Sequence, residues 1–286
     1  MKKVIRCLLI AILTMCLRGV SDASLLEPDG YRRVKIAECM NSPPAQFLLM
    51  VFANSFKELA PVSPAWQTLP SESLEDRKAL FDGLVIGAYD MIFTGDVEYT
   101  KKLDEMGMLR GVYPVFRERL ILVGPDDFAP SPMGLGAGDI MKKIFTDQRL
   151  FFSPIKNKWI VESESAMWSG LGVKNPADNR QYVETGRDDV DALYLVGDEG
   201  GFMLVGEASF AQYVDSARTS APIVKLADTE YYRTSYVCLI STFGFRKERT
   251  AAADKYVAWL KSDDGRKVIE DFNIGGITPF VSPDSK

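Results

Sequence analysis

Predicted strands and helices alternate along almost the whole chain, and this order constrains the fold more than any single motif. Short apolar runs predict strands, and segments whose apolar residues have helical spacing lie between them. Alternation of this kind is typical of α/β proteins. The predicted strands are 33–39, 89–93, 113–123, 150–153, 182–185, 202–205, 223–226 and 235–241. The predicted helices are 43–57, 71–81, 94–106, 159–171, 187–196, 207–214, 251–260 and 262–272.

The N-terminus has the composition of an export signal. Lys2, Lys3 and Arg6 precede an apolar run of 11 residues at 7–17, which is too short to span about 30 Å of hydrocarbon. Small residues follow at 21–23, so we predict a signal peptide over 1–23 that is cleaved after residue 23. Residues 13–16 also resemble a lipobox ending in Cys16. Met15 stands where a small residue is required, which makes a lipoprotein the less favoured alternative.

The charge of the chain argues against some partners. Cleavage removes four basic residues and one acidic residue, so 34 basic and 39 acidic residues become 30 and 38, and the net charge changes from −5 to −8. An acidic balance without a basic run argues against nucleic acid and anionic membrane surfaces. A locally positive site for an anionic ligand remains compatible with this balance.

The chain contains no histidine. Histidine is the commonest general base and metal ligand, and Ser-His and Cys-His nucleophile pairs depend on it. The carboxylates of Glu162 and Glu164 diverge at their helical spacing, and those of Asp263 and Asp264 suit the start of a helix. The sequence therefore predicts a binding protein rather than an enzyme, with no catalytic residues, no metal and no cofactor.

Two cysteines remain after cleavage of the predicted signal, Cys39 and Cys238. In an oxidising compartment they could form a disulfide. They could equally be two separate buried thiols that pack as small hydrophobic side chains. The sequence leaves both alternatives open.

Five segments, taken in order, resemble one family. They are Tyr-Asp-Met-Ile-Phe-Thr at 89–94, Arg-Leu-Ile-Leu-Val-Gly-Pro at 119–125, Gly-Gly-Phe-Met-Leu at 200–204, Ser-Tyr-Val-Cys-Leu-Ile at 235–240, and the closing segment at 262–281. Together they resemble the extracellular tungstate-binding subfamily of type II periplasmic solute-binding proteins, over roughly residues 33 to 283.

The resemblance implies two α/β lobes joined by two crossing strands, which we place at 113–123 and 235–241. Lobe 1 would comprise 24–118 and 236–286, and lobe 2 would comprise 119–235. A small-molecule ligand would lie between the lobes, where helix N-termini present free N–H groups. The protein would be a periplasmic monomer that closes on its ligand and delivers it to a membrane ABC permease.

The sequence departs from the resembled subfamily at two ligand-binding places. The subfamily has a run of Thr and Ser hydroxyls after its first strand, where this chain has Glu-Cys-Met-Asn-Ser at 38–42. It also has Ser-Arg after the first strand of lobe 2, where this chain has Ser153 and Pro154. Lys156 or Lys158 could restore the lost positive charge, but lysine cannot form a bidentate clamp. The predicted ligand is therefore a small anion, either a tungstate- or molybdate-like oxyanion or a small organic acid.

The candidate ligand-binding residues lie where predicted helices begin. Asn41 and Ser42, and also Thr94 and Gly95, either donate to a ligand or cap the helix that follows. Ser153, Asn157 and Lys158 occupy the place of the principal charged group of the resembled family.

The other candidates come from lobe 2 and from the second crossing strand. Thr185 and Arg187 could face an anion, or Arg187 could pair with a neighbouring aspartate. Tyr232 is expected to face the cleft, and Trp159 either stacks on a planar ligand or joins the core.

Two other functions remain possible from the sequence. A binding protein of this kind could present its ligand state to a membrane signalling receptor instead of a permease. A carboxylate-based hydrolase on the same scaffold is the least favoured reading, and it requires two carboxylates that face each other across the cleft with raised pKa values.

Overall fold

The computed structural model describes residues 32–40, 42–59, 62–68, 74–128, 135–216, 223–241 and 247–284. The predicted signal peptide, Asn41 and residues 71–73 of the predicted helix 71–81 lie outside these ranges. Among the helices that are described, none combines the length and the apolar character needed to cross a membrane.

Within the described residues, nine strands form one continuous mixed sheet. Eight of them follow the order β2-β1-β3-β8-β4-β7-β5-β6, and β9 pairs with β4. The strands are β1 Arg32–Cys39, β2 Val62–Thr68, β3 Met91–Thr94, β4 Leu109–Pro125, β5 Phe151–Pro154, β6 Tyr182–Thr185, β7 Phe202–Gly206, β8 Ile223–Ile240 and β9 Phe280–Val281. The predicted α/β class is confirmed.

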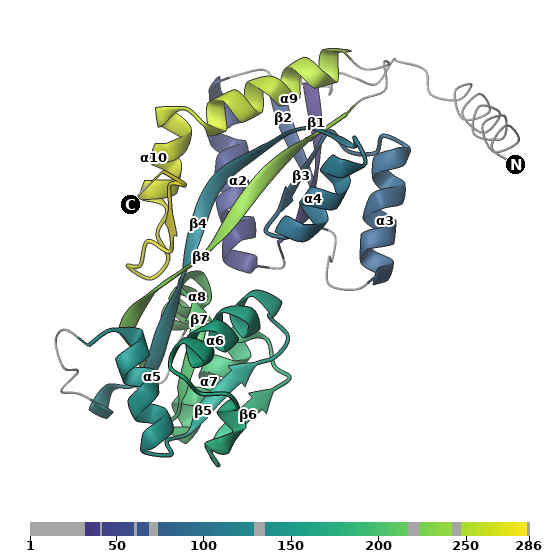
Figure 1. Cartoon of the computed structure of the whole chain (residues 1–286). Helices are drawn as coiled ribbons and strands as arrows, with labels where there is room; N and C mark the ends of the chain where they lie inside the picture. Colours follow the sequence, from purple (N-terminus) through teal and green to yellow (C-terminus); the bar gives the residue numbers. More distant parts are fainter. Residues whose placement is uncertain are drawn as a thin grey trace, which may run out of the picture.

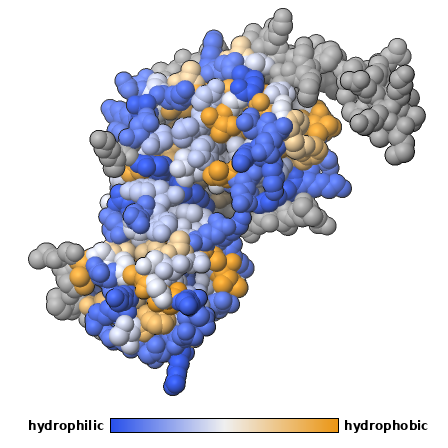
Figure 2. Space-filling view, in the orientation of Figure 1, coloured by the Kyte–Doolittle hydropathy of each residue, from blue (hydrophilic) through white to orange (hydrophobic). Residues whose placement is uncertain are grey.

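Helices cover both faces of this sheet and divide the molecule into two lobes (Figure 1). Lobe 1 contains β1–β3 with α2 Pro43–Leu59, α3 Leu74–Val85, α4 Val97–Glu105, α9 Lys247–Leu260 and α10 Asp263–Asp271. Lobe 2 contains β5–β7 with α5 Ala137–Thr146, α6 Lys158–Gly170, α7 Asp189–Glu199 and α8 Glu207–Ser216. The surface of the molecule narrows where the two lobes meet (Figure 2).

The two lobes share the antiparallel pair β4 and β8. These strands have 17 and 18 residues, and they pair from Leu109 with Ile240 in lobe 1 to Pro125 with Ile223 in lobe 2. Both expected crossing strands are therefore present, but the second is longer than predicted. The runs 223–226 and 235–241 are parts of one strand, because the polar residues between them also pair with β4.

The lobe 1 core has two layers because alternate residues of a strand point to opposite faces. Val34 and Ile36 face the side covered by α2, α9 and α10, while Ala37 and Cys39 face α3 and α4. Helix α2 presents a stripe of buried residues at helical spacing toward the sheet, and its first turn tolerates two prolines. The buried stripe consists of Ala45, Leu48, Leu49, Phe52 and Phe56.

The lobe 2 core alternates in the same way. In β4, Leu120 and Leu122 pack toward α5 and α6, and Ile121 and Val123 pack toward α7 and α8. All five residues of β7 are buried, which agrees with a continuous apolar run in the middle of a sheet.

The structure includes one strand that the sequence did not predict. The strand β2 contains Pro64, and proline disfavours a strand because it lacks an N–H group. It is tolerated here because β2 lies at the edge of the sheet, paired in parallel with β1 alone among the described strands. The cysteines do not form a disulfide. Cys39 and Cys238 are both buried thiols, and burial raises the pKa of each to about 12.

Candidate functional site

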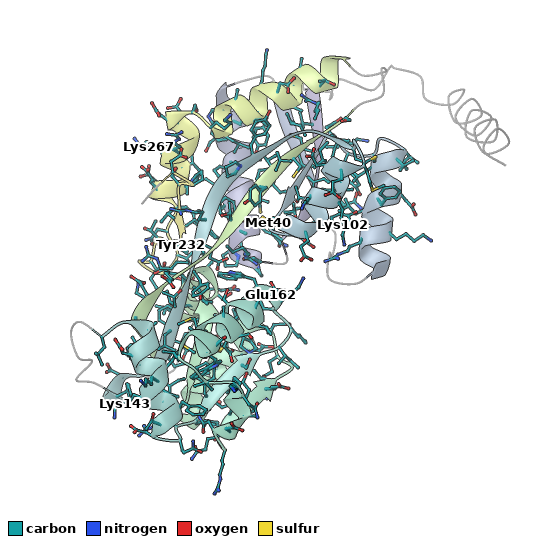
Figure 3. The ribbon with its side chains drawn as sticks, in the orientation of Figure 1. Met40, Lys102, Lys143, Glu162, Tyr232 and Lys267 are labelled. Atoms are coloured by element: carbon teal, nitrogen blue, oxygen red, sulfur yellow. The ribbon has the colours of Figure 1, made fainter. Side chains whose placement is uncertain are left out.

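A cleft of about 1180 Å³ lies between the two lobes. Lobe 1 contributes residues around the start of α2 and α4, and lobe 2 contributes the first turns of α6 and α7 with one face of α8. The shared strands contribute Glu118, Tyr232 and Arg233. In Figure 3, Tyr232 and Glu162 lie where the lobes meet, whereas Lys143 and Lys267 lie far from it.

The cleft contains more carboxylates than cations. Seven acidic and four basic side chains line it. They are Asp96, Glu98, Glu118, Glu162, Asp188, Asp189 and Asp191, with Arg77, Lys156, Lys158 and Arg233. Each of the four cations forms an ion pair with one of these carboxylates. In the part of the chain that the structure describes, no group of three or more His, Cys, Asp or Glu side chains is arranged to hold a metal ion.

A buried ion pair joins the two shared strands at the cleft. Glu118 of β4 lies opposite Arg233 of β8 in the sheet register, and an Arg233 guanidinium nitrogen lies 2.6 Å from Glu118 Oε2. The other carboxylate oxygen accepts a hydrogen bond from the backbone N–H of Ala208, at 3.2 Å. Glycine at 206 makes this possible, because a Cβ there would lie 2.3 Å from Glu118 Oε1. The Arg233 guanidinium also lies over the Trp159 ring, 5.1 Å from its centroid.

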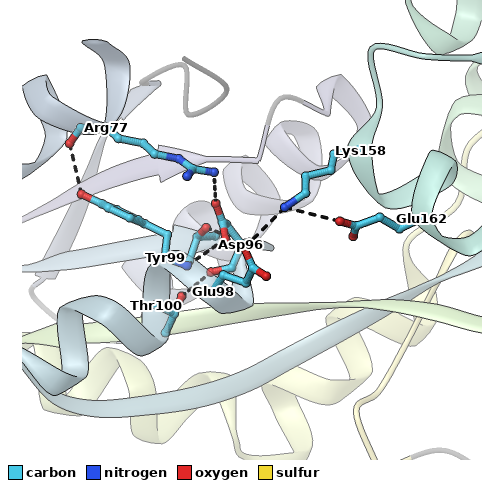
Figure 4. A network of polar contacts seen from close by, with 8 residues as sticks. Arg77, Asp96, Glu98, Tyr99, Thr100, Lys158 and Glu162 are labelled. Atoms are coloured by element: carbon cyan, nitrogen blue, oxygen red, sulfur yellow. Dashed lines mark hydrogen bonds and ion pairs between the residues drawn. The ribbon is translucent and has the colours of Figure 1, made fainter. Parts of the chain in front are cut away.

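The lobe 1 edge of the cleft is already saturated by its own contacts. Asp96 caps α4 by accepting from the Tyr99 N–H at 2.9 Å, and it forms an ion pair with Arg77 at 2.7 Å (Figure 4). The Thr94 hydroxyl is buried and accepts from the Asp96 N–H at 3.0 Å. These contacts leave neither Arg77 nor the Asp96 carboxylate as an open charge toward the cleft.

The other helix start in lobe 1 has few donors. Helix α2 begins with Pro43 and Pro44, neither of which carries an N–H group, and the next donor, on Ala45, belongs to a buried residue. Ser42 lines the cleft just before this helix. The first turn of α2 thus offers an anion fewer backbone hydrogen bonds than an ordinary helix N-terminus does.

An exposed ion pair connects the lobes across the cleft. Lys158 Nζ of α6 lies 3.5 Å from a Glu98 oxygen of α4 in lobe 1 and 3.4 Å from a Glu162 oxygen one turn along its own helix (Figure 4). Hydrogen bonding to Glu162 raises the pKa of Lys158, and the charge of Glu98 adds to this effect.

The lobe 2 edge of the cleft has an uncapped helix and a carboxylate that forms no ion pair with a described side chain. Asn157 is the N-cap residue of α6, but its side chain makes no capping hydrogen bond. Its Nδ2 instead donates to Asp189 Oδ2 at 2.8 Å, and the Ser209 hydroxyl lies 3.5 Å from the same oxygen. Among the described side chains, none forms an ion pair with Asp189. Burial raises the pKa of the Asp189 carboxyl to about 6, and the charge of Glu118 adds to this effect. The hydrogen bond from Asn157 and the charge of Arg233 oppose it.

One more acceptor on this wall is without a partner. Gln212 of α8 lines the cleft, and its Oε1 atom is buried without a hydrogen bond among the described residues. The lobe 2 wall of the cleft therefore presents hydrogen-bond acceptors, and buried acceptors are normally paired with a donor.

The structure brings five of the ten predicted site residues together in the cleft: Ser42, Gly95, Asn157, Lys158 and Tyr232. Gly95 is close to the shared strands, because a Cβ there would lie 3.3 Å from Arg233 Cδ. Tyr232 is held by two arginines, with its hydroxyl accepting from Arg119 Nε at 2.9 Å and the Arg117 guanidinium 4.7 Å from its ring centroid.

Four other predicted residues do not line the cleft, and one is outside the described ranges. Thr94 and Thr185 are buried, and each hydroxyl accepts from the backbone N–H two residues later, as in a local turn. Ser153 is also buried and hydrogen-bonds the Glu164 carboxyl. Arg187 is exposed away from the cleft wall. The remaining residue, Asn41, lies outside the described ranges.

Sequence reasoning missed the residues that dominate the charge of the cleft. Glu118 was not predicted. It lies between Phe116 and Leu120 on one face of the predicted strand, and an acidic residue between apolar neighbours on the same face indicates a buried partner. Arg233 directly follows the predicted site residue Tyr232 but was not itself predicted. Asp189 is one of the aspartates near Arg187, for which the sequence suggested only an ion pair with that arginine.

The comparisons with known proteins identify the fold. No protein-family model matches the chain, and no curated protein matches it. A tungstate-binding protein from Desulfovibrio alaskensis G20 matches with a TM-score of 0.75 and 18% identity, covering 88% of this chain and 99% of that protein. The structure of a tungstate ABC transporter from Geobacter sulfurreducens matches with a TM-score of 0.64 and 18% identity, covering 84% of this chain and 98% of that one. Iron-bound HitA from Pseudomonas aeruginosa matches with a TM-score of 0.61 and 11% identity, covering 89% of this chain and 90% of that one.

The chain has the two-lobed type II periplasmic-binding-protein fold. The fold expected from the sequence resemblance is thus confirmed, and the similar solved structures include the tungstate-binding proteins that the resemblance named. At 11 to 18% identity the likeness establishes the fold, and the chemistry of the cleft must be read from this chain's own residues.

Proposed function

We propose that this protein is a solute-binding protein that captures a small organic acid between its two lobes. The observation that carries the proposal is the cleft of about 1180 Å³, lined from both lobes and backed by the two strands that join them. Pockets for small organic molecules commonly measure about 300–1,000 Å³, so the lobes need to approach only modestly to enclose one.

Closure would use the paired strands β4 and β8 as the hinge. Their register shifts at four places, including between Pro114 and Phe116 and between Arg119 and Ile121, and irregular pairing of this kind allows a strand pair to bend. The cross-lobe contact from Lys158 to Glu98 would shorten as the lobes approach. An exposed pair of this kind contributes only about 0.2–1 kcal/mol, so the solute must supply most of the closing free energy.

The acid group of the solute would bind at the first turn of α6. This helix start is uncapped by its own side chain and therefore offers free backbone N–H groups with a favourable dipole. Lys158 lies in the same turn. A bare tungstate- or molybdate-like oxyanion is the weaker candidate, because all four cations of the cleft already have carboxylate partners.

The closed protein would deliver its solute to a membrane ABC permease, acting as a periplasmic monomer. The predicted export signal supports this location, and the similar structures that are named as ABC transporter components support this partner. A membrane signalling receptor is the alternative partner. Neighbouring genes for a permease and an ATPase would favour transport, and a neighbouring receptor gene would favour sensing.

A combined screen tests the capture of a solute. The purified protein would be heated with single amino acids, small organic acids, tungstate or molybdate, because a bound solute raises the melting temperature by mass action. Any hit would then be examined by small-angle X-ray scattering, where closure lowers the radius of gyration. A binding solute that leaves the scattering unchanged would contradict capture by closure.

A lysine substitution tests the position of the acid group. Lys158→Ala should lower the affinity for an acidic solute several-fold, as expected for the loss of a partly exposed charge contact. Lys142→Ala, an exposed lysine on α5 outside the cleft, is the matched control and should leave the affinity unchanged. Equal affinities in both variants would remove Lys158 from the site.

A further inference from the structure

We infer that the solute is a zwitterion in which an ammonium group lies close to a carboxylate, as in an amino acid. The inference rests on the proposed function and adds the chemical class of the ligand. It depends on how donors and acceptors are distributed along the lobe 2 wall, and each part of that distribution is considered in turn.

The cleft cannot accept a purely anionic solute without adding to an existing excess of negative charge. Arg77, Lys158 and Arg233 are each within 3.5 Å of a carboxylate oxygen, and Lys156 Nζ lies 3.3 Å from Asp188 Oδ1. With seven carboxylates and four cations, the cleft as a whole has a negative net charge. Like charges at short range in a partly desolvated site repel more strongly than they do in water. A solute of zero or positive net charge fits this wall better.

The wall also contains a carboxylate and an amide oxygen that require a donor. Asp189 is desolvated, accepts only neutral hydrogen bonds from Asn157 and Ser209, and forms no ion pair with a described residue. The charge of Arg233 acts on it without forming an ion pair, because Arg233 is paired with Glu118. The unpaired Gln212 Oε1 lines the same cleft. An ammonium group has three N–H donors, so it can satisfy both acceptors and balance the charge of Asp189.

The donors for the other end of the solute lie beside these acceptors. Asn157 begins α6, and its side chain, 2.8 Å from Asp189, is committed to that carboxylate instead of to the helix. The uncapped N–H groups of α6 and the Asp189 carboxylate are therefore neighbours. One solute can bind both only if its negative and positive groups are also neighbours. This spacing is the chemical signature of an amino acid.

A matched ligand panel tests the inference. Isothermal titration would compare each of the twenty common L-amino acids with its desamino acid and with the corresponding amine, for example leucine with 4-methylpentanoate and 3-methylbutylamine. Tungstate and calcium would complete the panel. At least one amino acid should bind about tenfold or more tightly than both of its analogues, since a charge-assisted hydrogen bond is lost in each analogue.

The alternative outcomes separate the two proposals. Tighter binding of a desamino acid or of tungstate would overturn the zwitterion and leave solute capture standing. Tighter binding of the amine or of calcium would also overturn it, since the acid group would then be unnecessary. If no member of the panel binds, the zwitterion is overturned, and the scattering measurement on solutes from the wider screen decides solute capture separately.

A pair of variants assigns the ammonium site. Asp189→Asn should reduce amino acid affinity about tenfold or more while leaving the affinity for the desamino acid unchanged or improved. Asp198→Asn, on the exposed distal part of the same helix, should change neither affinity. Equal losses for the amino acid and its desamino analogue in Asp189→Asn would show that the substitution disturbs the wall, and they would overturn the assignment.

Discussion

The two edges of the cleft differ in how their helix starts are satisfied. In lobe 1, the N-terminus of α4 is capped by Asp96, and the first turn of α2 lacks two N–H groups because of Pro43 and Pro44. In lobe 2, the side chain of Asn157 does not cap α6, and Asp189 at the start of α7 forms no ion pair with a described residue. The described polar groups at the lobe 1 edge of the cleft are satisfied without a solute, whereas those at the lobe 2 edge are not.

This difference indicates that recognition takes place mainly on lobe 2. Unsatisfied polar groups destabilise a protein unless a partner is supplied, so they are retained where a ligand binds. Lobe 1 would then act chiefly as a cover that approaches the loaded wall. Substitutions on lobe 1 should therefore change stability more than affinity, and substitutions on the lobe 2 wall should change affinity.

The largest expected effect concerns the ion pair between Glu118 and Arg233 on the two strands that both lobes share. Glu118→Gln leaves the buried Arg233 guanidinium without its anionic partner, and loss of one member of a buried pair typically destabilises by about 3–5 kcal/mol. Chemical denaturation should show this loss. Arg266→Ala, which removes an exposed ion pair with Asp284, is the control and should change stability by less than about 1 kcal/mol. Similar small losses of stability in both variants would contradict a structural role for the Glu118–Arg233 pair.

The second prediction sharpens the comparison from the lobe 2 side. Asp189→Asn should stabilise the solute-free protein by up to about 3 kcal/mol at pH 7, because it removes a desolvated charge whose pKa is raised to about 6 from 3.8. The folded state holds this proton more tightly than the unfolded state does. The unmodified protein therefore loses stability as pH rises from about 4 to about 6. The stability advantage of the Asp189→Asn variant develops over the same interval.

Denaturation at several pH values measures this linkage. The groups that act on Asp189 are Asn157, Ser209, Glu118 and Arg233, and the last two form an ion pair with each other. The two proteins should have equal stability near pH 4 and differ fully above pH 6. A constant difference at all pH values would show that the effect is not electrostatic.

The third prediction examines lobe 1. Asp96→Ala removes the cap of α4 and the partner of Arg77, and loss of an N-cap side chain costs about 0.5–2 kcal/mol. Affinity for the solute should change by less than about twofold if lobe 1 acts as a cover. A tenfold loss of affinity without loss of the melting temperature would instead place recognition on lobe 1.

The smallest expected effect concerns the cross-lobe ion pair. Glu98→Gln should lower stability by less than about 1 kcal/mol, because the pair is exposed. It should nevertheless shift the solute-free protein toward more open forms, with a larger radius of gyration. High salt should have the same effect on the unmodified protein, since screening weakens exposed pairs. An unchanged radius in both experiments would show that the pair does not influence closure.

Much of the fold could be predicted from the sequence because the apolar spacing is regular. The stripe on α2 and the two-faced alternation in β4 identify a helix and a strand without further information. The edge strand β2 was missed because of Pro64. The middle of β8 was missed because residues 227–234 are largely polar, and they are held in the sheet by pairing with β4, which a single segment does not reveal.

The site was harder to predict than the fold because its contacts join distant parts of the chain. Ser153 looked like a ligand donor, but all four residues of β5 are buried, so the usual alternation could not show which face its hydroxyl takes. Glu118 and Arg233 are 115 residues apart, and only the strand register brings them together. The uncapped state of α6 depends on Asn157 reaching another helix, which local sequence cannot specify.

The path of the chain through β4 and β8 has a consequence for how the protein is made. Residues 135–216 lie within lobe 2, whereas the lobe 1 core needs Val34 and Phe52 from the beginning of the chain and Tyr256, Trp259 and Phe280 from its end. The core of lobe 1, whose first strand is made early, can therefore be completed only after the last residues have been synthesised. Truncation near the carboxyl terminus would abolish the half of the protein that is translated first.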